Sequence, residues 1–282
     1  MSYAFLSLCL AGVNDLAFKA YGSKARPVGL LLAIVGAVWA LVFTALAVFR
    51  GAAAIDLKTF LLGSLAGIFS AVSNILLIEG MKRASASIGS TIYRLNLVFV
   101  AVLAVILLGE TLGPLKLLGL FAATAAVALF SLGGRGSGSQ LAMRFLLILV
   151  AASFLRACMG ITYKFANLAG ANDALFLAVS GVWWTVFGLA YTGFQERGSG
   201  VDMRSSIIGY GILCGALLSG VVFFLKQAVN AMDASIAVSV SQLSFLVTAP
   251  LSACLLGEKM TVAKGVGLAL AVICLALFYM ER

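Results

Sequence analysis

The chain has 282 residues, of which 63% are hydrophobic and only 10% are charged, and its net charge is +9. A soluble domain usually carries about 25% charged residues, so this composition excludes a soluble globular protein. The basic residues are spaced between long apolar blocks rather than clustered on one solvated face, which argues against a nucleic-acid-binding protein. An integral membrane protein is the class that remains.

Ten apolar stretches follow one another along the chain, each long enough for a membrane-crossing helix of about 20 residues. They cover residues 3–21, 28–49, 59–81, 87–108, 114–134, 145–167, 174–194, 206–230, 235–256 and 262–280. Ten such helices take up roughly 200 residues, so the connections are short and leave no room for a soluble domain. The expected fold class is an all-α polytopic membrane protein, whose first stretch is a retained helix rather than a signal peptide.

The sequence contains no histidine, and its five cysteines lie inside the apolar stretches without the spacing of a metal site. An intramembrane enzyme would need a nucleophile with a base, or paired acids. Only Asp15 and Glu79 are acidic within the stretches, and they are far apart in the sequence. A phosphate-binding loop signature is also absent, which excludes ATP-driven pumping by this chain. The sequence therefore predicts neither an enzyme nor a cofactor or metal site.

Basic residues in the connections indicate the orientation in the membrane, because the side richer in Lys and Arg faces the cytoplasm. The connections after the first, third, fifth, seventh and ninth stretches carry ten basic residues, and the opposite side carries four. The ten are Lys24, Arg26, Lys82, Arg83, Arg135, Arg144, Arg197, Arg204, Lys259 and Lys264. We expect a multi-pass protein of the inner or plasma membrane with both termini on the non-cytoplasmic side.

An internal repeat divides the chain. Residues 86–130 align without gaps with residues 234–278, at an offset of 148, with 17 identical positions. The matches include an Ala-Ser-Ile start and a Leu-Leu-Gly-Glu turn in both copies. Each repeat spans five helices, so the second copy must cross the membrane in the opposite sense to the first. Inverted repeats of this kind are typical of transporters whose halves rock about a site near the bilayer midplane.

The repeated pattern resembles the drug/metabolite transporter superfamily, specifically its EamA-type ten-helix members. In both halves Ala-Ser-Ile is followed by an apolar span, by Leu-Leu-Gly-Glu, and by a Lys and a Gly in the next helix. The resemblance implies two five-helix halves around a central cavity, residues 1–137 and 138–282, and carriage of small metabolites. One departure is visible, because the proline often found in the fourth helix is present as Pro250 but replaced by Val102 in the first half.

Ionisable and amide side chains inside a span normally face the protein interior or a water-filled cavity. Arg94 shares a helical face with Ser87, Ser90 and Thr91, and the repeat places Gln242 opposite Arg94. The candidate substrate-binding residues are Arg94, Arg156, Lys226, Gln242, Lys164, Lys19, Asn96, Tyr163 and Gln227. The candidates for proton coupling are Asp15 and Glu79.

Several of these residues also have structural interpretations. Asp15 and Lys19 are spaced for an ion pair on one helix, and Lys19 could instead extend to the helix end. Glu79 could pair with Lys82 or Arg83. The glutamates of the two Leu-Leu-Gly-Glu turns follow a glycine cap and precede the next helix, so we expect them to lie at its positive N-terminus.

Lys116 and Lys264, at the starts of their spans, are counted with the connections. Five basic and two acidic residues then lie inside the spans, so a cavity lined by all of them would carry a net charge of +3. Such a cavity favours a small anionic or zwitterionic metabolite, such as an amino acid, an organic acid or a phosphorylated compound. The predicted function is secondary transport by alternating access, as an exporter or exchanger, with proton antiport and facilitated diffusion as alternatives for the energy source. The other functions considered are a flippase for a lipid-linked sugar or another amphipathic substrate, and a non-transporting assembly protein. Either a monomer or a homodimer is compatible with the sequence.

Overall fold

The computed structural model describes residues 1–22, 27–52, 54–81, 93–132, 143–196, 204–257 and 260–281. Within these ranges the chain is all-helical and contains no strand. The helices are α1 (Ser2–Gly22), α2 (Val28–Phe49), α3 (Leu57–Met81), α5 (Asn96–Leu108), α6 (Pro114–Leu132), α7 (Met143–Leu168), α8 (Asp173–Gln195), α9 (Arg204–Ala231), α10 (Ala234–Gln242), α11 (Phe245–Leu256) and α12 (Val262–Met280).

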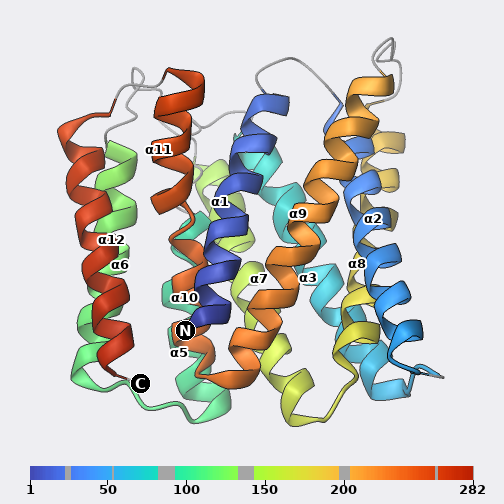
Figure 1. Cartoon of the computed structure of the whole chain (residues 1–282), viewed down its shortest axis with the longest axis horizontal. Helices are drawn as coiled ribbons and strands as arrows, with labels where there is room; N and C mark the ends of the chain where they lie inside the picture. The colour runs from blue at the N-terminus through green and yellow to red at the C-terminus, as the bar shows by residue number, and fades with distance from the viewer. Residues whose placement is uncertain are drawn as a thin grey trace.

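Long apolar helices make the chain a multi-pass membrane protein. In the described part of the chain, seven spans are long and apolar enough to cross a bilayer, and α10 and α11 together form one of them. Two shorter apolar helices, Asn96–Leu108 and Pro114–Leu129, accompany them. The helices run side by side across the height of the molecule (Figure 1). The predicted spans therefore correspond to helices wherever the structure describes them.

The helices pack in a few extensive pairs. α2 packs against α8, α6 against α12, α3 against α7, and α1 against α9. Figure 1 shows the α6–α12 pair at one side of the molecule and the α2–α8 pair at the other. Glycines allow α2 and α8 to approach closely, because a Cβ atom on Gly188 would lie 2.4 Å from the backbone nitrogen of Ala33. Small residues play this role at many membrane helix interfaces.

The ninth predicted span is interrupted, which corrects the expectation of one helix over residues 235–256. α10 ends at Gln242, and α11 begins at Phe245 after a turn at Leu243 and Ser244. A turn at Leu95 likewise precedes α5, so the fourth predicted span is also not one continuous helix. Both α5 and α11 end in the predicted left-handed glycine caps, with φ 66° and ψ 23° at Gly109 and at Gly257.

Candidate substrate site

Arg156 lies on α7 in the middle of the membrane span and has a single polar contact with the described residues. Its Nη1 donates to the Ser70 hydroxyl of α3 at 3.2 Å. The same hydroxyl accepts a hydrogen bond from Trp184 Nε1 of α8 at 3.0 Å. Arg156 Nε is buried and has no hydrogen-bond partner in the described part of the chain. Nor does Arg156 form an ion pair with any described residue, so no described carboxylate neutralises its charge.

Uncharged polar side chains continue the Arg156 face of α7. Ser153, Arg156, Gly160 and Tyr163 follow the i, i+3, i+7, i+10 spacing of one helical face. The hydroxyls of Ser153 and Tyr163 are buried and have no hydrogen-bond partner among the described residues. The Tyr163 ring packs edge-on against Phe176, with the ring centroids 5.2 Å apart.

This face of α7 meets α5 and α10. A Cβ atom on Gly160 would lie 3.0 Å from Val238 of α10 and 3.7 Å from Val100 of α5. Asn96, one turn before Val100, is fully buried, and neither atom of its amide has a partner in the described ranges. The hydroxyl of Ser239, next to Val238, is also buried and has no hydrogen-bond partner among the described residues. Unsatisfied buried polar groups are uncommon in proteins, and each of the three helices α5, α7 and α10 carries at least one.

The guanidinium of Arg94, in the short stretch before α5, is bound by three other residues of the protein. Its Nη2 lies 3.0 Å from Asp15 Oδ2, and its Nη1 donates to the Ser244 hydroxyl at 3.0 Å and to the Gln242 backbone carbonyl. Ser244 also donates to Asp15 at 2.7 Å. The expected Asp15–Lys19 ion pair is therefore wrong, because Asp15 faces Arg94 and α11 instead.

Lys226 of α9 is also paired, although it is fully buried. Its Nζ lies 2.8 Å from Asp173 Oδ1 and donates to Asn230 Oδ1 at 2.9 Å. Gln227 and Asn230 both donate to the second oxygen of Asp173. Asp173 was not recognised as a site residue from the sequence, because it lies just outside the predicted span at 174–194. The useful signal was its position after Asn172, which caps α8.

The remaining candidate side chains contact other helices. Lys164 Nζ donates to the backbone carbonyls of Val229 and Met232, at the C-terminal end of α9, at 2.9 and 2.7 Å. Glu79 accepts a hydrogen bond from the Tyr191 hydroxyl at 2.6 Å. Glu79 and Lys19 both have further interactions, so neither is an open charge. The expected Lys82 and Arg83 partners of Glu79, the polar residues Ser87, Ser90 and Thr91, and Glu258 lie outside the described residues.

Glu110 caps a helix of the other half, which corrects the expectation that it caps its own next helix. Its carboxylate accepts hydrogen bonds from the backbone nitrogens of Ala234 and Ser235, at 2.6 and 3.2 Å, and from the Ser235 hydroxyl at 2.5 Å. Lys116 of α6 lies 2.5 Å from the carboxylate of Asp233, directly before α10. These contacts join the α5–α6 connection to the start of α10.

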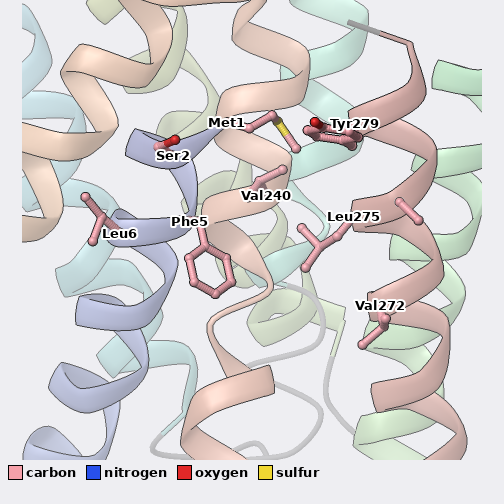
Figure 2. Close-up of a pocket in the computed structure, with 9 residues that line it drawn as sticks. Met1, Ser2, Phe5, Leu6, Val240, Val272, Leu275 and Tyr279 are labelled. Atoms are coloured by element: carbon pink, nitrogen blue, oxygen red, sulfur yellow. The ribbon is translucent and has the colours of Figure 1, made fainter.

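An apolar groove of about 670 Å³ between α1, α10 and α12 lies apart from the polar residues around Arg156. Residues of α1, α10 and α12 line it: Met1, Ser2, Phe5, Leu6, Val240, Val272, Leu275, Ala276 and Tyr279. Figure 2 shows Phe5 and Leu275 facing one another across it, with Val240 behind them. Its lining carries no charged side chain, so it suits hydrocarbon rather than an ion. We therefore place the candidate site for a polar substrate at Arg156 and not in this groove.

Comparisons with known proteins agree with this fold. The model of the EamA-like transporter family matches residues 1–132. Among 28 matching chains of solved structures, one titled "Crystal structure of protein" has a TM-score of 0.81 and 15% sequence identity. That alignment covers 99% of this chain and 96% of the other, so the likeness in fold extends over the whole chain. No curated protein matches the sequence.

Proposed function

We propose that this membrane protein, whose residues 1–132 match the model of the EamA-like transporter family, is a secondary transporter of the drug/metabolite transporter superfamily. It moves a small anionic or zwitterionic metabolite by alternating access, as an exporter or exchanger. The observation that carries the proposal is the Arg156 guanidinium, a membrane-embedded cation whose one polar contact in the described part of the chain is the Ser70 hydroxyl. An ionisable group at such depth is expensive unless it serves a pathway or a ligand.

Alternating access would rest on two inverted halves, residues 1–137 and 138–282. The packing of α1 with α9 has its counterpart in the packing of α7 with α3, as two repeats related by a two-fold axis require. In the same way, the packing of α2 against α9 corresponds to the packing of α8 against α3. Arg94 and Gln242, which the repeat aligns at an offset of 148, are in direct contact. Residues aligned in this way touch when they lie next to the axis.

The substrate-binding set that we propose is centred on Arg156, with Asn96, Tyr163 and Ser239 as uncharged partners. These side chains are largely enclosed in this conformation, so a substrate reaches them only when the halves move apart. Arg94, Lys226, Gln227 and Lys164 join helices to one another instead. The interrupted ninth span, α10 and α11, supports a site at this level, because broken helices commonly form transporter binding sites.

The orientation that we propose has both termini outside the cytoplasm, because the richer set of basic residues lies in the connections at the opposite side. Figure 1 places the termini at the end where α5–α6, α7–α8 and α9–α10 connect. Glu110, Lys116 and Asp233 fasten two of these connections together. This end would then be the closed, outer end of the carrier.

Flux measurements test the proposed function. The protein is reconstituted in proteoliposomes, and uptake of labelled organic acids, amino acids and phosphorylated metabolites is measured for wild type, Arg156→Gln and Arg144→Gln. Arg144 lies on the same helix but is exposed near its start, so it is a matched control. We expect saturable uptake that Arg156→Gln abolishes and Arg144→Gln preserves. Absence of uptake, or uptake that is equal in both variants, contradicts the proposal.

The energy source can be examined in the same vesicles. Asp15 remains the coupling candidate, because protonation of its carboxylate would release Arg94 from the pair at 3.0 Å. A pH gradient imposed across the membrane should alter uptake if a proton is coupled to it, and Asp15→Asn should remove the response. Uptake that does not change with the pH gradient would indicate exchange or facilitated diffusion.

The apolar groove between α1, α10 and α12 favours a second candidate function, a flippase for an amphipathic substrate. Its wall includes Val240 of α10, two residues before the last residue of that helix. A lipid tail could occupy this groove while a polar head group enters the protein. Translocation of a fluorescent lipid in vesicles, with no Arg156-dependent flux of water-soluble metabolites, would favour this function over the first.

A further inference from the structure

We infer that the Arg156 site is matched to a substrate with a single negative charge and uncharged hydrogen-bonding groups, rather than to a zwitterion or a dianion. The inference rests on the proposed transport function and narrows its substrate class to monocarboxylates that carry hydroxyl, carbonyl or amide groups. The charges that the described helices present to a substrate carry the argument.

Almost all cations of the spans are already bound by other groups of the protein. Arg94 faces Asp15, and Lys226 faces Asp173, each at 3.0 Å or less. Lys164 donates to two carbonyls at the end of α9, and Lys19 has a partner as well. Among the described residues inside the predicted spans, Arg156 alone offers a guanidinium with no carboxylate or carbonyl bound to it. Inside the described spans Arg156 is therefore the one cation left to bind a substrate anion, although a count of span residues gives a net charge of +3.

The acids of the spans are equally occupied. Asp15 accepts from Arg94 and Ser244, and Asp173 accepts from Lys226, Gln227 and Asn230. Glu79 accepts from Tyr191 and has further contacts. Each carboxylate of the described spans already binds groups of the protein, so none of them is available to pair with a substrate ammonium group. A zwitterion would have to leave that ammonium unpaired away from water, which costs several-fold more than leaving a neutral group unpaired.

A dianion meets the converse problem, because Arg156 can balance only one of its charges. A phosphate monoester carries about 1.5 to 2 negative charges at neutral pH and falls in this class. The other unsatisfied polar groups of α5, α7 and α10 are neutral instead. Asn96 offers an amide that can donate and accept, and the hydroxyls of Ser153, Tyr163 and Ser239 can do both. These groups suit the hydroxyl, carbonyl or amide oxygens of a substrate whose carboxylate lies on Arg156.

The test is a thermal-shift titration of the purified full-length protein with sets of compounds that differ only in charge. One set is glycerate, serine, tartronate and glyceramide, and a larger set is gluconate, glucosaminate, glucarate and gluconamide. Each set contains a monoanion, a zwitterion, a dianion and a neutral compound. We expect the monoanion of at least one set to bind at least about tenfold more tightly than its other members. Arg156→Gln should remove this binding, and Arg144→Gln should retain it.

The outcomes separate this inference from the proposed function. A zwitterion or dianion that binds through Arg156 as tightly as its matched monoanion overturns the inference but leaves transport at Arg156 standing. The inference is also overturned if no member of either set binds through Arg156. The proposed function fails on a different measurement, if the proteoliposome flux is unchanged in Arg156→Gln.

Discussion

Arg94 donates a hydrogen bond to the backbone carbonyl of Gln242, the residue that lies 148 positions further along the chain. That separation equals the repeat offset, so two aligned positions are in direct contact. The contact occurs at the carbonyl end of α10, where the ninth span is interrupted. With Asp15 on its other nitrogen, the Arg94 side chain holds together the stretch before α5, helix α1 and the break between α10 and α11.

Removal of the Asp15 charge should destabilise the protein more than removal of the pair. Asp15→Asn leaves Arg94 without a counter-ion, and since the Asp15 side chain is 37% exposed we expect a loss of about 1–3 kcal/mol, below the range for fully buried pairs. The double variant Asp15→Asn/Arg94→Gln should recover part of this loss. The measurement is the thermal unfolding midpoint in detergent. Equal midpoints for the single and double variants would show that the pair does not couple.

For the Lys226–Asp173 pair, removal of the carboxylate should destabilise the protein clearly more than removal of the ammonium group, because Lys226 is fully buried. Asp173→Asn leaves a buried ammonium uncompensated, and a loss of about 3–5 kcal/mol is expected. Lys226→Met replaces the ammonium by an apolar side chain of similar length and should cost less, because Gln227 and Asn230 still donate to Asp173. The two unfolding midpoints, measured in parallel, check the order. A larger loss in Lys226→Met contradicts it.

Glu110 should stabilise the start of α10 from the other half of the chain. Glu110→Gln weakens three hydrogen bonds that now end on a charged carboxylate, and the expected loss is about 1–2 kcal/mol. Hydrogen exchange of the Ala234 and Ser235 amides reports the effect locally. We expect faster exchange there and unchanged exchange at the start of α8, which Asn172 caps. Faster exchange in both places would indicate a global loss of stability instead.

Two glycines of α8 provide a matched test of the α2–α8 packing. Gly188→Ala would place a Cβ atom 2.4 Å from the backbone nitrogen of Ala33 and should cost about 1–3 kcal/mol through overpacking. Gly193→Ala meets nothing within 4 Å and should be neutral or stabilising by up to about 1 kcal/mol. The comparison of unfolding midpoints tests the contact, and similar midpoints would contradict such a close approach of the two helices.

The sequence predicts the helices well because continuous apolar runs and glycine caps are local signals. Gly109 and Gly257 end α5 and α11 as expected. The interruption at Leu243 and Ser244 leaves no such signal, since neither glycine nor proline occurs there. Its stabilising contact, from Arg94 to the Gln242 carbonyl, comes from the other half of the chain.

Ion pairing was harder to predict because it depends on which helices become neighbours. The spacing of Asp15 and Lys19 suggested a pair within one helix, yet packing brings Arg94 and Ser244 to Asp15. Asp173 lies at a helix start, outside the apolar run, and was overlooked although it neutralises Lys226. A count of charges in the spans therefore overestimated the open charge, and only the contacts single out Arg156.

Parallel kinetics of Arg156→Gln and Arg94→Gln test the central claim most directly. Both variants remove one guanidinium from a span, and for each the KM and maximal rate of uptake in proteoliposomes are compared with its unfolding midpoint. The account predicts that Arg156→Gln abolishes saturable uptake and leaves the unfolding midpoint nearly unchanged, whereas Arg94→Gln lowers the midpoint and leaves the KM near that of wild type. Preserved uptake in Arg156→Gln, together with uptake lost in a stable Arg94→Gln protein, would contradict the assignment of Arg156 as the substrate's counter-ion.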